Sequence, residues 1–405
     1  MAPSLILVPL ILIPIFLGSV SAISPPKTDT LKPGQQLRDW EQLISARKVF
    51  TLGFFTPTES STFSLGSAGL RYIGIWSEHG LSNPVWVGNP TESVYDSSGS
   101  LSIDTNGVLK ITSANASPIT VVRPHLSSAG NVSATLLDSG NFVIRETGPG
   151  GGPGRVLWQS FDHPGSILLP GMKIGFNLKT KKEISVTSWT SNKVPAPGAF
   201  RLGLDPSGAD QLLVWRHGEI YWSSGKLSNN GSSQLNLELS SSYIDYEFTF
   251  HSDKHMKYFS YSVKKTNGSV FSSWLLDTLG QITVTNSLES KTSIRGSSES
   301  SGPCKTDSKN SSAICIAEKP TACRKGSEYF EPRRGFMMDN AYYGVGLSSG
   351  ISDCHGSCWR NCSCVAFERS SGGRCQYWGK GSTFVPYDTF NVNLELIVYV
   401  LDSAK

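Results

Sequence analysis

The chain has 405 residues, of which 38% are hydrophobic and 10% aromatic, enough for two or three domains with real cores. Its net charge of +4 is small and dispersed along the sequence, which argues against a nucleic-acid-binding protein. The 40 glycines and 22 prolines are scattered rather than clustered, a distribution that favours many turns between short strands.

Residues 1–22 have most features of a secretory signal peptide. Residues 5–17 form an apolar run that contains Pro9 and Pro14, and Val20-Ser21-Ala22 offers small residues for cleavage, although no Lys or Arg lies near Met1. The run is shorter than the ~20 residues of a membrane-spanning helix. No later segment is long enough either, because the apolar stretch 394–401 has only the length of a strand. We therefore expect a secreted chain without a membrane span.

A short pattern recurs through the first 300 residues: an apolar residue, Asp, turn residues, Gly and then alternating apolar positions. Clear copies begin at Ile103 and Leu276, and looser copies begin at Leu137 and Leu204. The Asp carboxylate can accept hydrogen bonds from backbone N–H groups two residues on, while Gly takes the positive φ that closes a hairpin. Because apolar residues alternate on both sides, the pattern predicts an all-β body of repeated sheets.

All eight cysteines lie after residue 300. We therefore expect the first 300 residues to fold without disulfides, and the C-terminal part to be small and disulfide-stapled. Residues 290–312, rich in Ser, Gly and Lys, are typical of a linker, and the Gly/Pro run 148–154 indicates a weaker boundary between two β-rich halves. Only residues 352–362 suggest a helix. Zinc binding by the cysteines is disfavoured, because secretion would oxidise thiolates.

Six Asn-x-Ser sequons are candidate N-glycan sites, and in a secreted chain they indicate surface loops. The acceptor residues are Asn115, Asn131, Asn230, Asn267, Asn310 and Asn361. Asn361 is the least typical of them because it lies within the densest run of cysteines.

Longer stretches carry a family pattern. They are Pro-Val-Trp-Val-Gly-Asn at 84–89, Ala-Thr-Leu-Leu-Asp-Ser-Gly-Asn-Phe-Val at 134–143, Trp-Gln-Ser-Phe-Asp-His-Pro at 158–164, Leu-Leu-Pro-Gly-Met at 168–172, and the cysteine-rich stretches 354–367 and 373–378. In this order they resemble the extracellular part of plant S-domain receptor kinases, also called G-type lectin receptor kinases, and the related S-locus glycoproteins. The resemblance covers almost the whole chain after the signal segment.

This resemblance implies an all-β architecture of tandem bulb-type lectin domains, each a β-prism of three small sheets, at residues 23–150 and 151–300. Core tryptophans are expected at Trp86, Trp158, Trp189 and Trp215. A cysteine-containing linker, 301–325, replaces the family's usual EGF-like module. A small disulfide-rich α+β module of the PAN/apple type, a short helix cradled by an antiparallel sheet, is expected at 326–402.

The resemblance also implies disulfide pairs. Family pairing would join Cys354 to Cys375 and Cys358 to Cys364. Four cysteines then remain, and a Cys323–Cys362 bridge is one of the pairings open to them. The remaining cysteines are Cys304, Cys315, Cys323 and Cys362.

Mannose-binding members of the family carry Gln-x-Asp-x-Asn-x-Val-x-Tyr, in which polar side chains grip sugar hydroxyls. The corresponding positions here are Ser102, Asp104, Asn106, Val108 and Lys110. Serine is too short to replace glutamine, and lysine donates but cannot accept a hydrogen bond, unlike the tyrosine hydroxyl. Asp104 and Asn106 also have a simpler role as turn residues of the repeat. We therefore expect a degenerate sugar site in which the turn role prevails.

No motif set indicates catalysis. A kinase needs a Gly-rich loop, a strand lysine and catalytic-loop motifs, but the chain has no His-Arg-Asp, Asp-Phe-Gly or Val-Ala-Ile-Lys. Residues 346–350 have the letters of a hydrolase elbow, yet the only downstream histidine, His355, adjoins Cys354. We expect no catalytic residue, metal or cofactor.

Together these features predict a secreted, non-catalytic recognition protein at the plant cell surface. Its expected partners are a carbohydrate, peptide or lipid-like ligand and, through the PAN module, a second copy or an S-domain receptor kinase; no nucleic acid is expected. The alternative is a truncated or splice form of a receptor kinase whose membrane span and kinase domain are absent. A storage-type mannose lectin is a weaker third interpretation, because the motif at 102–110 is altered.

Overall fold

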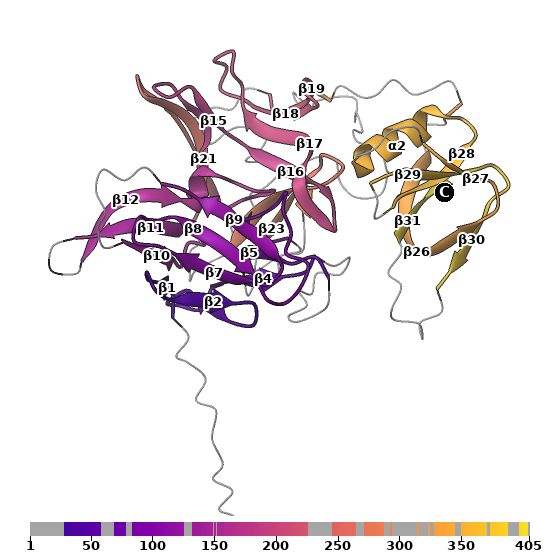
Figure 1. Cartoon of the computed structure of the whole chain (residues 1–405). Helices are drawn as coiled ribbons and strands as arrows, with labels where there is room; N and C mark the ends of the chain where they lie inside the picture. Colours follow the sequence, from indigo (N-terminus) through magenta and orange to yellow (C-terminus); the bar gives the residue numbers. More distant parts are fainter. Residues whose placement is uncertain are drawn as a thin grey trace, which may run out of the picture.

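The computed structural model describes residues 28–57, 69–77, 83–124, 132–148, 150, 152–225, 245–264, 271–286, 292–293, 314–315, 323–324, 328–344, 350–370, 373–387 and 397–403. The expected signal segment lies outside them. Antiparallel strands build seven sheets, and α2 (Ile351–Arg360) is the only α-helix within these ranges. Figure 1 shows two parts, which we call the β body (residues 28–293 with β25) and the C-terminal module (residues 323–403).

The first half of the β body contains three four-stranded sheets. In two of them the earliest strand lies beside strands from much later in the chain, and in the third the four strands follow one another in chain order. In spatial order the sheets are β3 (Gln42–Ile44), β4 (Phe50–Phe55), β5 (Tyr72–Ser77) and β6 (Trp86–Val87); β2 (Gln36–Arg38), β7 (Ser100–Ile103), β8 (Leu109–Ser113) and β9 (Ala116–Val122); and β1 (Thr30–Leu31), β10 (Val132–Leu136), β11 (Phe142–Thr147) and β12 (Pro153–Gln159).

The second half repeats this plan after the short 3-10 helix η2 (Ser160–Asp162), with two four-stranded sheets and one of five strands. They are β13 (Ile167–Leu168), β22 (Ser272–Leu276), β23 (Ile282–Asn286) and β24 (Thr292–Ser293); β15 (Lys182–Ile184), β14 (Ile174–Asn177), β21 (Met256–Lys264) and β20 (Asp245–Ser252); and β16 (Val186–Ser191), β17 (Val194–Leu204), β18 (Leu212–Arg216), β19 (Glu219–Ser223) and β25 (Ile314–Cys315).

The recurring Asp–Gly pattern forms hairpins, as its spacing predicts. The four copies connect β7 to β8, β10 to β11, β17 to β18 and β22 to β23. In each copy the glycine has a positive φ, a conformation that a residue with a Cβ rarely adopts. The four glycines are Gly107, Gly140, Gly208 and Gly280.

The Gly/Pro run 148–154 is not a boundary between the two halves. Gly148 N donates to Gly152 O at 2.8 Å, and Pro153 and Gly154 already belong to β12, which pairs back onto β11. The described residues of the run therefore lie within the β11–β12 hairpin of the first half. The chain passes to the second half only around η2. A Gly/Pro-rich segment is as typical of a hairpin loop as of a linker. Its composition alone therefore predicted the boundary between the halves at the wrong residues.

The two halves share one hydrophobic core. A single cluster of buried side chains extends from Leu31 in β1 to Val284 in β23. A second aromatic cluster joins the halves, because Trp189 of β16 is buried among Phe55, Tyr72 and Trp76 of the first half. Of the other expected core tryptophans, Trp86 and Trp215 are buried, and Trp158 is half-buried with its ring 5.6 Å from that of Trp86.

The C-terminal module consists of α2 packed on a six-stranded sheet. The sheet order is β27 (Ala341–Tyr343), β29 (Cys375–Gly379), β28 (Cys364–Arg369), β31 (Ile397–Ser403), β26 (Glu328–Met338) and β30 (Thr383–Pro386). Two small buried clusters lie at this sheet, one of them built around the disulfides that tie the helix to the strands. A short helix on an antiparallel sheet is the arrangement that the family resemblance implies.

Arg324 stabilises the end of α2. Its buried guanidinium donates to the carbonyl oxygens of Cys358, Trp359, Asn361 and Cys364 at 2.8–3.2 Å. The last carbonyls of a helix have no partner within the helix, so a cation at this end satisfies them and offsets the helix dipole. The neighbouring Cys323–Cys362 bridge anchors Arg324 in this position.

Candidate ligand-binding sites

The degenerate sugar motif lies on the β7–β8 hairpin. Asp104 Oδ1 accepts from the backbone N–H groups of Asn106 (2.9 Å) and Val108 (3.0 Å), while Gly107 N donates to Asp104 O at 2.9 Å. One carboxylate oxygen of Asp104 is therefore engaged in the turn. Val108 is buried and Asn106 is exposed.

The β22–β23 hairpin has the same geometry without the sugar motif. Asp277 Oδ1 accepts from Leu279 N (2.9 Å) and Gln281 N (2.8 Å), and Gly280 N donates to Asp277 O at 3.1 Å. The hydrogen bonds of Asp104 are thus those of the repeated turn. They account for Asp104 without a bound sugar.

The aspartates of the other two copies make contacts that Asp104 does not make. Asp138 Oδ1 accepts from Arg47 N at 2.7 Å and so holds the loop before β4. Burial disfavours the charge of Asp205, but hydrogen bonds from Gln211 and Ser207 outweigh it and keep the pKa of this carboxyl below its ordinary value. Both side chains serve local structure.

The two altered positions of the sugar motif face each other on the outer side of the sheet. Ser102 of β7 is paired with Lys110 of β8, Ser102 also with Gln36 of β2, and Lys110 also with Thr120 of β9. Cross-strand partners lie on the same face, so these four residues form a polar row, all of them half-buried or exposed. Gln36 could not be assigned to this row from the sequence, because only the sheet places this glutamine beside Ser102.

Two of the predicted glycan acceptors lie within the described residues. Asn115 is exposed in the turn between β8 and β9, as a glycan site requires. Asn361 is also exposed, but its Nδ2, the atom that would carry the glycan, donates to Tyr342 Oη at 2.9 Å. The other four acceptors, at Asn131, Asn230, Asn267 and Asn310, lie outside the described residues.

Three disulfides occur in the C-terminal module. Two are the pairs that the family resemblance implies, and the third is the pairing that the sequence left open. Cys354 is bonded to Cys375, Cys358 to Cys364, and Cys323 to Cys362. Cys315 lies in β25, and Cys304 lies outside the described residues. The first two bridges tie α2 to β29 and β28, and the third ties the chain before β26 to the end of α2.

The candidates for catalysis, metal binding and membrane insertion gain no support. His355 is stacked on Trp359 and lies edge-on to Phe330, so it packs beside the module's core, and residues 346–349 lie outside the described residues. Within the described ranges, no three His, Cys, Asp or Glu side chains are placed to hold a metal ion. No helix in those ranges has the length and apolar character needed to cross a bilayer.

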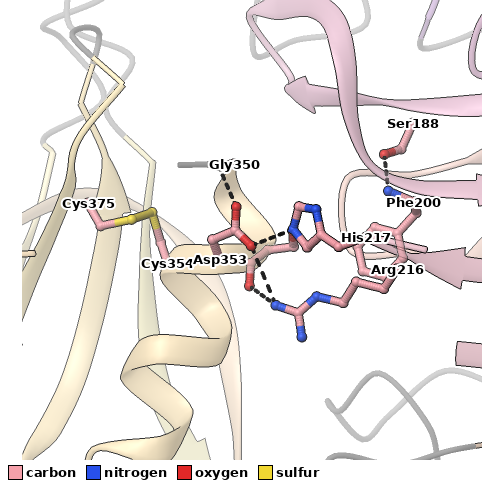
Figure 2. Close-up of polar contacts among 9 residues, drawn as sticks. Ser188, Phe200, Arg216, His217, Gly350, Asp353, Cys354 and Cys375 are labelled. Atoms are coloured by element: carbon pink, nitrogen blue, oxygen red, sulfur yellow. Dashed lines mark hydrogen bonds and ion pairs between the residues drawn. A yellow bond between two sulfur atoms is a disulfide. The ribbon is translucent and has the colours of Figure 1, made fainter. Parts of the chain in front are cut away.

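A polar junction joins the β body to the C-terminal module (Figure 2). Asp353, in the first turn of α2, accepts from Gly350 N at 2.9 Å through Oδ2, while its Oδ1 lies 2.9 Å from His217 Nε2 and 3.6 Å from an Arg216 nitrogen. Arg216 also donates to Ser352 O at 3.2 Å. The same carboxylate thus caps the helix and contacts the β18–β19 turn.

An apolar contact accompanies this junction. Leu279, from the β22–β23 turn, packs against the buried cluster of the C-terminal module. This copy of the repeated turn therefore holds the module rather than facing solvent. From the sequence we expected only a linker between the two parts. The contact could not be inferred from the sequence, because His217 and Asp353 are 136 positions apart.

Comparisons with known proteins agree with this architecture. The family model described as D-mannose binding lectin matches residues 83–190, and the one described as PAN-like domain matches residues 323–382. Three similar curated proteins of Arabidopsis thaliana are G-type lectin S-receptor-like serine/threonine-protein kinases: CES101 (30% identical, covering 88% of this chain and 44% of the relative), At1g67520 (30%, 87% and 41%) and At2g19130 (31%, 87% and 45%). The chain thus spans less than half the length of these relatives.

Proposed function

Because this chain carries a D-mannose binding lectin domain and a PAN-like domain and is homologous to G-type lectin S-receptor-like kinases, we propose that it is a non-catalytic carbohydrate-recognition protein that acts outside the cell. The observation that carries this proposal is the lectin match itself, which includes the β7–β8 hairpin with Ser102 and Lys110 of the outward polar row. The three disulfides support an oxidising, extracellular compartment.

The proposed ligand is not mannose bound in the manner of the bulb lectins. Asp104 is engaged in the turn, and Ser102 and Lys110 replace the two end groups that such a site needs. Gln36, beside Ser102, supplies an amide from the neighbouring strand instead. A ligand bound by Gln36, Ser102 and Lys110 would meet hydrogen-bond donors and acceptors that differ from those of the mannose motif.

A glycan array with the purified chain tests the proposal. We expect binding to one class of glycan and no measurable binding to mannose. The double variant Ser102→Gln, Lys110→Tyr should gain weak mannose binding, since the spacing of the hairpin is unchanged. Asp104→Asn is the control, because it keeps a turn-compatible side chain. Mannose binding by the native chain that is lost in a folded Asp104→Asn would refute the turn role.

A second candidate is that these residues form the recognition part of a longer receptor kinase. It is favoured by the coverage, since the chain spans 41–45% of three kinase relatives. Sequencing transcripts past the codon for Lys405 decides between the two. A continuous reading frame with a spanning segment and kinase motifs supports the receptor, whereas a stop codon in every transcript supports a free recognition protein. In either case, we propose that the C-terminal module is the part that pairs with a receptor kinase.

A further inference from the structure

Lysines far apart in the sequence gather at one end of the sheet β15-β14-β21-β20. The β14–β15 turn and the β20–β21 turn are adjacent, since Leu178 N donates to His255 O at 2.7 Å. Exposed basic side chains from both turns therefore share one tip, and we call them the basic tip. They are Lys179, Lys181, Lys182, Lys254 and His255.

The acidic side chain of the β20–β21 turn, Asp253, is already engaged. Asp253 Oδ1 accepts from His255 N and Met256 N at 2.7 Å each, and its Oδ2 lies 2.9 Å from His251 Nε2. Hydrogen bonds from His251 and these backbone amides lower the pKa of Asp253, so its charge is held within the turn. In the portion that the structure describes, no ion pair reaches Lys179, Lys181, Lys182 or Lys254.

An aromatic platform lies on the same sheet, beside the tip. Tyr258 of β21 is paired with Gly175 on one side and with His251 on the other. The His251 ring stacks on the Tyr258 ring at 4.8 Å, and Lys173 Nζ lies 4.5 Å from the ring centroid. Gly175 lets β14 and β21 approach closely, since a Cβ at this position would lie 2.1 Å from Lys257 O. Amphipathic rings of this kind present both an apolar body and a polar tip.

We propose that the basic tip and the Tyr258 platform bind an anionic polysaccharide, whose sugar rings carry carboxylate groups. Lysines act as separate point charges on flexible stems, so several of them suit repeated carboxylates along a polymer. Positive charge that is not balanced locally also raises the rate of encounter with a polyanion. Figure 1 shows β15 and β21 on the side of the β body away from the C-terminal module, where a long polymer has access.

An anionic membrane surface is the less suitable partner. Membrane-surface binding elements combine basic residues with a broad apolar face that enters the lipid. Among the described residues of the two turns, Leu178 is the only large apolar side chain that is strongly exposed, at 49%. The proposal rests on carbohydrate recognition as the function, but it uses a different sheet from the altered sugar motif.

The test measures binding of the full chain to polygalacturonate, with neutral mannan and dextran alongside, at 50 and 500 mM NaCl. We expect binding to polygalacturonate alone, weakened at the higher salt because screening there shortens the range of charge interactions. The variant Lys179→Glu, Lys182→Glu, Lys254→Glu should bind at least tenfold more weakly at 50 mM. The control Lys32→Glu, Arg374→Glu, Lys380→Glu changes the net charge equally, at exposed positions elsewhere, and should bind like wild type.

Two further arms identify the ligand class. Tyr258→Leu should weaken binding to polygalacturonate but leave binding to poly-glutamate, a polyanion without sugar rings, unchanged. Equal binding of poly-glutamate and polygalacturonate by the wild type, or preferential binding to phosphatidylserine vesicles, overturns the sugar assignment. Equal loss in the tip and control variants overturns the site. Binding of a neutral glycan but not of polygalacturonate refutes this inference alone, whereas binding of no glycan refutes the proposed function as well.

Discussion

Residues 28–293 of the β body contain no cysteine and rely on a core that runs without interruption through both halves. The C-terminal module instead has two small buried clusters, and one of them consists partly of its own disulfides. A large chain buries enough apolar surface to be stable by itself, whereas a small module does not. The same chain therefore contains one part that should tolerate reduction and another that should not.

The buried charges extend this contrast. In the β body, the guanidinium of Arg71 is paired with the carboxylate of Asp39, and the side chains are 1% and 2% exposed. Arg71 also donates to Thr56 Oγ1 at 3.1 Å. In the module, the buried Arg324 is satisfied by carbonyl oxygens. One part thus contains a fully buried ion pair, and the other uses a cation to end a helix.

The largest expected effect comes from breaking the buried pair. Asp39→Ala leaves the Arg71 guanidinium buried without its carboxylate and should lower the free energy of unfolding of the β body by about 3–5 kcal/mol. Urea unfolding, monitored by tryptophan fluorescence, measures this free energy. Glu146→Ala, which removes the partner of the 58%-exposed Arg155, is the control and should cost less than about 1 kcal/mol. Equal effects of the two variants would contradict the importance of burial.

Next in size is the loss of a module disulfide. The double variant Cys354→Ser, Cys375→Ser removes the bridge between α2 and β29 and should destabilise the module by about 2–5 kcal/mol. Limited proteolysis should then cut within residues 328–403 while the β body stays intact. Reduction of the wild type should give the same pattern. A variant as protease-resistant as wild type would show that the small core suffices.

A smaller effect is expected in the β7–β8 turn. Gly107 has a φ of 74°, so Gly107→Val places a β-branched residue in a left-handed conformation and should cost more than about 1 kcal/mol. Asp104→Asn keeps an acceptor for the turn amides and should change the stability little. Thermal unfolding of the two variants compares them directly. A larger loss for Asp104→Asn than for Gly107→Val would mean that the carboxylate charge, rather than the turn geometry, matters.

The smallest expected effect concerns the junction between the two parts. Asp353→Asn removes the charge that faces Arg216 and His217 but keeps an acceptor for Gly350 N, so α2 should remain capped. Because His217 is 60% exposed and Asp353 31%, the loss in stability should be at most about 1 kcal/mol.

The separation of the two parts is the more sensitive readout. Small-angle scattering should show a larger radius of gyration for Asp353→Asn, and for the wild type at high salt. Leu279→Ala removes the apolar contact and should act in the same direction. Unchanged scattering for both variants would mean that neither contact holds the module.

Much of the fold follows from local sequence. The two clear Asp–Gly copies are hairpins because the carboxylate and the glycine act within four residues of each other. The helix at 351–360 lies where the pattern at 352–362 indicated. The altered residues at 102 and 110 and the family resemblance of the cysteines are likewise evident from the amino-acid sequence. These features depend on neighbours in the chain or on long matching motifs.

Tertiary structure alone decided the rest. The Gly/Pro run 148–154 forms a hairpin because β12 pairs with β11, a choice that its composition leaves open. The lysines are dispersed along the chain, yet two turns that are distant in the sequence meet through Leu178 and His255. Likewise, Gln36 joins the Ser102 row only through the fold. Contacts between distant segments depend on strand order and packing, and no short stretch of sequence records which partner the folded chain brings alongside it.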